Sequence, residues 1–419
     1  MKILIIGGGG REHALAWSIS ASPLCDELII APGNPGIAKL GRCVDIPAED
    51  TDRLARLAGD EGVDLVIVGP EVPLVAGLVD RLVEAGIPAF GPRADAAQLE
   101  GSKAFARDFC DRHAIPQPRW QKFQNTEQAK AFAADLNGYC VIKADGLAAG
   151  KGVIVCANGD EANQAIDELL GGKFGAASSE ILVEERITGP EISAFALLDG
   201  EAALWLASAQ DHKRAFDGDE GPNTGGMGAV SPSPFETDVL REEIMRTIIA
   251  PVATGMAAEG QPYSGVLYAG LMLTKDGPKV IEFNCRFGDP EAQVILPRLK
   301  SDFLSAALTV AEGGLQNFDL RWTDDAAVTV VMAADGYPEA YHKGQPIGGA
   351  DQLETEGGGL IFHAGTARNS AGQLVSSGGR VLAVTALGAD KDKARQTAYQ
   401  AVQKIDWPGA MFRTDIANS

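Results

Sequence analysis

Short apolar runs alternate with helical patterns throughout the first hundred residues, and this alternation leaves few folds open to the chain. Runs of four or five apolar residues between helices are typical of parallel strands that are buried on both faces. The segments with this pattern are the predicted strands 2–6, 28–31, 64–68 and 88–90 and the predicted helices 11–20 and 73–85. We therefore predict an α/β fold with a doubly wound parallel sheet, in which ligands bind beyond the carboxyl ends of the strands.

Composition agrees with an enzyme of this class and argues against several others. The chain has 419 residues, enough for about two to four domains, and 50 glycines, too many for a simple helix bundle because glycine weakens helix interiors. Its net charge of −21 disfavours nucleic acid as a partner, since an acidic surface repels phosphate chains. Six cysteines without metal-binding spacing, and the lack of a long apolar segment, predict a cytoplasmic protein with no membrane partner.

The first predicted strand runs into the turn GGGGREH at residues 7–13. This turn is not a dinucleotide fingerprint, because Glu12 and His13 stand where G-x-G-x-x-G needs its last glycine. The second strand ends in Ala31 and a proline, not in the acidic residue that would hold a ribose. A glycine loop before a helix N-terminus still suits an anion, with Arg11 as a further donor, although the turn also has a purely structural interpretation as tight packing.

A second glycine-rich segment, KADGLAAGKG at 143–152, lies between two predicted strands. It is not a Walker A loop, because Gly152 follows Lys151 and a strand follows in place of a helix. A hairpin of this kind, with Lys143 on its first strand and Lys151 in its loop, is suited to cover a triphosphate. The alternative is a solvated hairpin tip, which does not explain the run of small residues.

The segment KVIEFNCRFGDPE at 279–291 carries the sharpest local signal. Glu282 and Asn284 are two residues apart on a predicted strand, so both point to one face. Hard oxygen ligands of this kind are what magnesium bound to phosphates requires. If the strand continues, Arg286 faces the same side and suits an acyl phosphate or carboxylate. The alternative is an edge strand with a polar face exposed to water.

Three weaker signals lie between these segments. Glu184 and Glu185 end a predicted strand, where an acid and the adjacent backbone can read an adenine edge, and the nearby Glu191 can hold ribose hydroxyls. Residues 211–214 (DHKR) and 221–228 (GPNTGGMG) form a polar and then glycine-rich connection, which either carries binding groups or is simply mobile.

Together these segments resemble the ATP-grasp ligases and, among them, the phosphoribosylamine–glycine ligase (glycinamide ribonucleotide synthetase) family. The resemblance runs nearly from end to end, and the order and spacing of its motifs are highly specific. The motifs are GGGGREHAL (7–15), APGN (31–34), VGPEVPL (68–74), LEGSKAF (99–105), IKADGLAAGKGV (142–153), QDHKR (210–214), GPNTGGMGA (221–229), LYAGLM (267–272), KVIEFNCRFGDPE (279–291), HAGT (363–366) and GGRVL (378–382).

The resemblance implies ATP-dependent ligation of glycine to 5-phosphoribosylamine through glycyl phosphate in de novo purine synthesis. It also implies three domains: an N-terminal phosphoribosylamine-binding α/β domain at 1–102, an ATP-grasp domain at 103–327 with a mobile lid at about 124–195, and a small C-terminal α+β domain at 328–419. The implied cofactor is Mg²⁺ or Mn²⁺, with ATP as co-substrate. The implied partners are small molecules, and the implied assembly is a monomer or weak homodimer.

The resemblance also assigns individual residues. Arg286 and Lys143 are expected to be catalytic, and Glu282 and Asn284 to bind the metal ion. The residues expected to bind ATP are Lys103, Lys143, Lys151, Glu184, Glu185, Ile187 and Glu191. The residues expected to bind the other two substrates are Gly9, Gly10, Arg11, Asn34, Gly69, Pro70, Glu71, Asp211, Lys213, Asn223, Thr224, Gly225 and Arg286.

Three other functions stay open from the sequence. The nearest is another ATP-grasp carboxylate–amine ligase or carboxylase. ADP formation that depends on an acid other than glycine would favour it. A nicotinamide-dependent oxidoreductase is disfavoured by Glu12 and Ala31. A non-catalytic nucleotide sensor is disfavoured because Lys143, Glu282 and Asn284 are all present.

Overall fold

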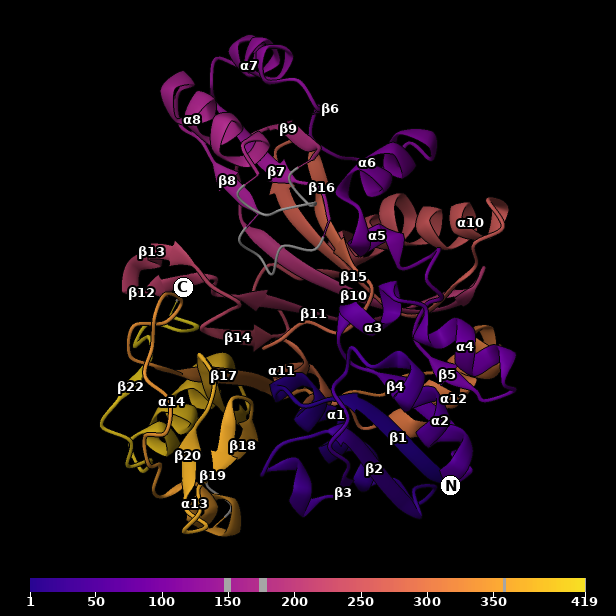
Figure 1. Ribbon diagram of the computed structural model, residues 1–419, viewed down its shortest axis with the longest axis vertical. Helices are drawn as coiled ribbons and strands as arrows, with labels where there is room; N and C mark the ends of the chain where they lie inside the picture. The colour runs from indigo at the N-terminus through magenta and orange to yellow at the C-terminus, as the bar shows by residue number, and fades with distance from the viewer. Residues whose placement is uncertain (147–151, 173–178, 357–358, 419) are drawn as a thin grey trace.

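The computed structural model describes residues 1–146, 152–172, 179–356 and 359–418. Figure 1 shows the indigo N-terminal sheet, a small magenta sheet at the far end of the molecule, and the yellow C-terminal elements. A long central sheet runs between these three parts. Among the described residues, no helix is both long and apolar enough to cross a membrane.

The N-terminal sheet is parallel and has the strand order β3-β2-β1-β4-β5. Its strands are β1 (Lys2–Gly7), β2 (Glu27–Pro32), β3 (Arg42–Cys43), β4 (Leu65–Val68) and β5 (Ala89–Phe90). Alternate side chains of β1 enter two different cores, one with helix α1 (Gly10–Ser20) and the other with α2 (Thr51–Glu61) and α4 (Leu78–Glu84). Helices therefore cover both faces, which confirms the predicted doubly wound sheet.

The predicted helix at 73–85 is wrong in one respect, because the structure divides it in two. Helix α3 spans Glu71–Val75 and helix α4 begins at Leu78. The break is at Gly77, which adopts a left-handed conformation with φ +79°. Glycine adopts this conformation without the steric cost that other residues incur, so the chain turns here.

The small sheet is antiparallel, with the strand order β6-β9-β7-β8. It contains β6 (Trp120–Phe123), β7 (Cys140–Ala144), β8 (Val153–Val155) and β9 (Ile181–Glu185). Helices α7 (Thr126–Asp135) and α8 (Gly159–Leu170) pack on it around a core of its own. This unit begins earlier than the lid expected at about 124–195, because β6 is its first strand. It also ends earlier, because the strand after Gly189 belongs to the central sheet.

The central sheet has the strand order β16-β15-β10-β11-β14-β17-β21-β18, with β22 paired to β17. Its strands are β10 (Glu191–Gly200), β11 (Ala203–Asp211), β14 (Gly228–Ser231), β15 (Tyr263–Thr274), β16 (Gly277–Asn284), β17 (Ala326–Ala334), β18 (Leu360–His363), β21 (Arg380–Gly388) and β22 (Ala410–Met411). Because β14 pairs with β17, the sheet continues across the domain boundary expected at 327/328.

The remaining elements connect and cover these sheets. They are the hairpins β12 (Arg214–Phe216) with β13 (Glu220–Asn223) and β19 (Thr366–Arg368) with β20 (Leu374–Ser376), and the helices α5 (Gln98–Gly101), α6 (Lys103–Arg112), α9 (Asp238–Ile244), α10 (Ala250–Ala258), α11 (Ala292–Ile295), α12 (Phe303–Glu312), α13 (Ala350–Glu356) and α14 (Lys391–Val402). Helix α6 begins at Lys103 because the Ser102 hydroxyl accepts a hydrogen bond from the Phe105 amide.

Candidate functional site

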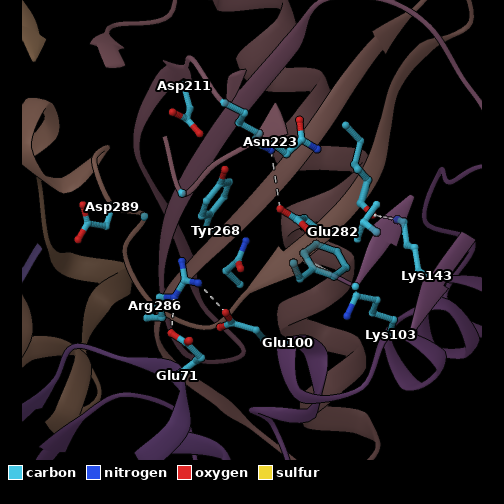
Figure 2. A pocket seen from close by; sticks show the side chains of 18 of the residues that line it. Glu71, Glu100, Lys103, Lys143, Asp211, Asn223, Tyr268, Glu282, Arg286 and Asp289 are labelled. Atoms are coloured by element: carbon cyan, nitrogen blue, oxygen red, sulfur yellow. Dashed lines mark hydrogen bonds and ion pairs between the residues drawn. The ribbon is translucent and has the colours of Figure 1, made fainter. Parts of the chain in front are cut away.

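One cavity of about 540 Å³ lies where the three sheets and the C-terminal elements meet (Figure 2). This volume is within the range of small-molecule sites. The predicted site residues that line it are Arg11, Glu71, Lys103, Lys143, Glu184, Asp211, Lys213, Asn223, Thr224, Gly225, Glu282, Asn284 and Arg286. Residues far apart in the sequence are thus brought to one site.

A buried ion triad forms the cavity wall beside the small sheet. Both oxygens of Glu184 accept from Arg107, at 2.8 Å each, and Lys143 Nζ lies 2.8 Å from Glu184 Oε2. Arg107 and Lys143 also donate to the Ile281 carbonyl on β16. The triad therefore fixes the small sheet to the central sheet, and the Glu184 carboxylate is not free to read an adenine edge.

The pKa values in this triad follow from burial and charge. Burial raises the pKa of Glu184, but Arg107 and Lys143 outweigh it and lower the pKa to about 2. Burial, together with the Arg107 charge, lowers the pKa of Lys143 although Glu184 opposes this. Lys103 donates to the Gly146 carbonyl at 2.8 Å, and burial lowers its pKa as well. Lys151 lies outside the described residues.

The triad gives a testable dependence of stability on pH. Since the folded pKa of Glu184 is below the ordinary value of 4.5, its ionisation stabilises the protein above pH 4.5 and the contribution falls as pH drops toward 2. We expect Glu184→Gln to lower the free energy of unfolding most at pH 7 and progressively less below pH 4.5. Urea unfolding of both proteins between pH 7 and pH 3 measures this difference. A difference that stays constant with pH contradicts the assignment.

Glu282 and Asn284 enter the same cavity from the end of β16, as their spacing predicts. Glu282 Oε1 is 3.9 Å from Lys213 Nζ. Burial raises the pKa of Glu282, but Lys213, Lys143 and Lys103 outweigh it and keep the pKa below its ordinary value. Glu282 therefore offers a charged oxygen beside the uncharged amide oxygen of Asn284, a pair of oxygens that suits a metal ion shared with phosphates. No group of three or more His, Cys, Asp or Glu with metal-binding geometry occurs in the described ranges.

The expectation that Arg286 extends the face of β16 is wrong, because the strand ends at Asn284. Arg286 lies between two carboxylates: its Nε is 3.3 Å from Glu71 and its terminal nitrogen 2.7 Å from Glu100 (Figure 2). Glu100 also accepts from the Cys285 amide at 2.8 Å. Arg286 still lines the cavity, but at the end near the N-terminal sheet.

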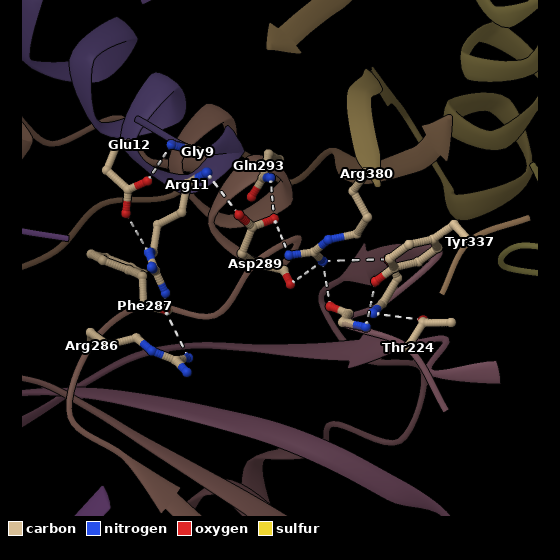
Figure 3. A network of polar contacts seen from close by, with 12 residues as sticks. Gly9, Arg11, Glu12, Thr224, Arg286, Phe287, Asp289, Gln293, Tyr337 and Arg380 are labelled. Atoms are coloured by element: carbon tan, nitrogen blue, oxygen red, sulfur yellow. Dashed lines mark hydrogen bonds and ion pairs between the residues drawn. The ribbon is translucent and has the colours of Figure 1, made fainter. Parts of the chain in front are cut away.

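At the N-terminus of α1, two of the amides expected to be available to an anion already donate to carboxylates of the protein. The Gly9 amide donates to Glu12 at 2.7 Å, and the Arg11 amide donates to Asp289 at 3.3 Å (Figure 3). Two carboxylates therefore cap amides that the sequence suggested were available. The Arg11 guanidinium donates to Glu12 at 2.7 Å and to the Phe287 carbonyl at 3.0 Å.

An acidic corner of the cavity contains Asp211 and Glu291. Asp211 Oδ1 is buried and has no hydrogen-bond partner within the described part of the chain. Burial and the Glu291 charge raise the pKa of Asp211 well above its ordinary value. Ser193 donates to Glu291 at 3.2 Å, and Lys213 lies 3.4 Å from Glu191. The corner is built to receive a cation or a hydrogen-bond donor.

Several predicted site residues do not line this cavity. Asn34 donates to the carbonyls of Gly8 and His363 and accepts from the Gly36 and Ile37 amides, so its polar atoms are all engaged. Glu191 is exposed in a small neighbouring recess beside Lys213, and Glu185 is exposed at the end of β9. The others outside the cavity lining are Gly9, Gly10, Gly69, Pro70 and Ile187.

The structure adds residues that the sequence did not assign: Glu100, Arg107, Tyr268, Asp289, Glu291, Tyr337 and Arg380 all line the cavity. Asp289 and Glu291 lie in the GDPE motif and Glu100 precedes SKAF, so these motifs could have indicated all three residues. Arg107 gave none, because a single arginine in a helix has no distinguishing local pattern.

Comparison with protein families gives matches along most of the chain. Residues 1–100 match the N domain, 101–292 the ATP-grasp (A) domain and 327–419 the C domain of phosphoribosylglycinamide synthetase. A phosphoribosylamine–glycine ligase from Caulobacter vibrioides is 51% identical over 417 residues, covering 99% of this chain and 97% of that protein. One from Vibrio vulnificus is 49% identical over 421 residues, with the same coverage.

Solved structures agree with these matches. A crystal structure of phosphoribosylamine–glycine ligase from Thermotoga maritima has a TM-score of 0.88 and 32% identity. The match covers 99% of this chain and 100% of that one. The biotin carboxylase domain of a 2-oxoglutarate carboxylase from Hydrogenobacter thermophilus has a TM-score of 0.72 at 17% identity, covering 98% of this chain and 91% of that one. The second likeness shows a shared fold only.

Proposed function

The chain belongs to the phosphoribosylglycinamide synthetase family, and from that premise we propose how its own side chains serve the reaction of the family. The protein joins glycine to 5-phosphoribosylamine at the expense of ATP, giving glycinamide ribonucleotide, ADP and phosphate in de novo purine synthesis. The observation that carries the residue assignments is that one cavity is lined by residues from all three matched regions.

We propose that the reaction passes through glycyl phosphate. A carboxylate does not condense with an amine at a useful rate, because oxide is a poor leaving group. Transfer of the γ-phosphoryl group to the glycine carboxylate makes phosphate the leaving group, which the amine of phosphoribosylamine then displaces. Such a transfer depends on positioning and charge neutralisation, not on a protein nucleophile. Lys103, Lys143 and Arg286 supply positive charge around the cavity.

We propose that Mg²⁺ or Mn²⁺ binds with ATP, and that Glu282 and Asn284 hold it. The donor set fits, since an ionised carboxylate and an amide oxygen are hard ligands and the phosphates complete the shell. The ion, when bound, offsets negative charge on the phosphates. The adenine end of ATP is assigned to Glu185, Ile187 and the backbone of β9, and the ribose to Glu191. Glu184 becomes a residue that positions Lys143.

We assign the opposite end of the cavity to glycine and phosphoribosylamine. The buried acceptor Asp211 Oδ1 suits the glycine ammonium group, with Lys213, Asn223 and Thr224 around it. The turns at 9–11 and 69–71 border the phosphoribosyl site, with Asn34 as a residue that holds the first turn in place. A phosphate that binds at α1 has to displace Glu12 or Asp289 from the helix amides.

Arg286→Ala is expected to reduce kcat/KM by roughly 10- to 100-fold, because it removes a charge-assisted donor near the reacting oxygens. Steady-state kinetics in all three substrates measure the loss. Arg112→Ala is the matched control, since Arg112 pairs with Glu259 at the surface and does not line the cavity. A kcat/KM for Arg286→Ala within a few fold of wild type rules out this role.

The first test of the proposed function measures ADP release in the presence of ATP and Mg²⁺. Glycine and phosphoribosylamine are supplied singly or together, and the phosphoribosylamine is formed in situ from ribose 5-phosphate and ammonia. Release that needs both substrates is the expected result. Release with a different acid keeps the ATP-grasp chemistry and points to another carboxylate–amine ligase. We further propose a cytoplasmic monomer or weak homodimer that acts on small molecules and binds neither nucleic acid nor membranes.

A further inference from the structure

Arg380, the first residue of β21, reaches from the C-terminal part of the chain into the cavity (Figure 3). One terminal nitrogen donates to the carbonyls of Gly225, Gly226 and Asp289, the last at 2.6 Å. The other terminal nitrogen lies 3.4 Å from the Asp289 carboxylate. Arg380 thus spans two chain segments that are both distant from it in sequence.

Tyr337 holds the same loop from the same side. Its hydroxyl oxygen accepts a hydrogen bond from the Gly225 amide at 3.0 Å. Gly225 therefore has its amide fixed by Tyr337 and its carbonyl fixed by Arg380, both from C-terminal elements. Thr224 completes the loop by donating to the Lys213 carbonyl at 2.9 Å.

The loop has little freedom to move without disturbing the substrate end of the cavity. Gly226 has φ +107°, and a Cβ atom there would lie 2.6 Å from Asp211 Oδ1 and 2.5 Å from Pro290 Cδ. The loop backbone is therefore packed directly against the carboxylate that we assign to glycine, so a displaced loop changes the surroundings of that carboxylate.

Asp289 carries the second connection. It accepts from the Arg11 amide at 3.3 Å and from Gln293 at 2.8 Å, so it joins α1 to α11. Burial raises the pKa of Asp289, but Arg380 and Arg11 outweigh it and keep the carboxylate charged. Arg380 consequently braces two parts of the substrate end, the 224–226 loop beside Asp211, which we assign to glycine, and the first turn of α1, which borders the phosphoribosyl site.

We propose that Arg380, assisted by Tyr337, is a positioning residue through which the C-terminal domain organises the end of the cavity that we assign to glycine and phosphoribosylamine. The proposal rests on the proposed function. The contacts described above all lie at that end, whereas Lys103, Lys143 and Glu282 hold the ATP end. Loss of Arg380 then weakens the binding of glycine and phosphoribosylamine and leaves ATP binding intact.

The test measures KM for ATP, for glycine and for phosphoribosylamine separately in wild type, Arg380→Ala, Arg380→Lys and Tyr337→Phe. We expect the KM values for glycine and phosphoribosylamine to rise roughly 10- to 100-fold in Arg380→Ala and about 3- to 10-fold in Tyr337→Phe, with the KM for ATP within about twofold of wild type. Arg380→Lys should be intermediate, since one ammonium group cannot span the same acceptors.

The control is Arg395→Ala, which removes another C-terminal arginine that donates to backbone carbonyls, those of Ile416 and Thr414, outside the cavity. Arg395→Ala is expected to leave all three KM values unchanged. An equal rise in all three KM values, or unchanged KM values for glycine and phosphoribosylamine in Arg380→Ala, overturns the proposal. If Arg380→Ala does not fold, the KM split in Tyr337→Phe decides. If the wild type does not need phosphoribosylamine, the proposed function itself has failed.

Discussion

Glu282→Gln is expected to reduce kcat/KM by roughly 100- to 1,000-fold at millimolar Mg²⁺. Glutamine keeps the size of the side chain but removes the charge that faces Lys213, Lys143 and Lys103. The metal ion is then offered two uncharged amide oxygens, that of the new side chain and that of Asn284, and no carboxylate. Because the loss is one of metal affinity, raising the Mn²⁺ or Mg²⁺ concentration should restore part of the activity.

Initial rates over a range of metal concentrations at saturating ATP measure this effect. Glu201→Gln, at an exposed position in the turn between β10 and β11, is the control and should behave as wild type. If Glu282→Gln shows the wild-type dependence on metal concentration, Glu282 is not a metal ligand. If kcat falls and excess metal does not restore it, the role of Glu282 is to balance the charge of the lysines.

The parts of the site that the sequence predicted well depend on short-range geometry. The alternation of strand residues placed Glu282 and Asn284 on one face, and both line the cavity. The apolar runs before the glycine turns predicted the parallel sheet, since a strand buried on both faces needs no distant partner to be recognised. Lys143 lies at the end of the predicted hairpin strand, where its neighbours in sequence are also its neighbours in space.

The parts that it missed depend on partners far along the chain. Arg107 lies 77 residues before Glu184, and Arg380 lies 155 residues after Gly225. The cap at α1 was missed for the same reason, because Asp289, which accepts from the Arg11 amide, is 278 residues away from it. A local pattern indicates which donors a segment offers, but only the tertiary structure determines whether a distant carboxylate already accepts from them.

Lys143→Met is the second large effect that we expect, a fall in kcat/KM of roughly 100- to 1,000-fold, with the KM for ATP raised. Methionine matches the length of the lysine stem but lacks the ammonium group that we assign to the ATP phosphates. Folding should survive, since Arg107 still holds both oxygens of Glu184, and the free energy of unfolding should fall by only about 1–3 kcal/mol. Urea unfolding and ATP titration separate the two effects.

The matched control is Lys122→Met, on β6 of the same small sheet, where the lysine pairs with Asp108 at 3.1 Å and has 46% of its side chain exposed. An exposed pair of this kind contributes little to stability, so this variant should keep both stability and kinetics. If Lys143→Met unfolds at a much lower urea concentration but retains the wild-type KM for ATP, the lysine serves only as a counter-ion for Glu184. If Lys143→Met unfolds like the wild type but loses most of its kcat/KM, the charge of Lys143 acts on ATP. The Arg107–Glu184 pair then suffices to hold the two sheets together.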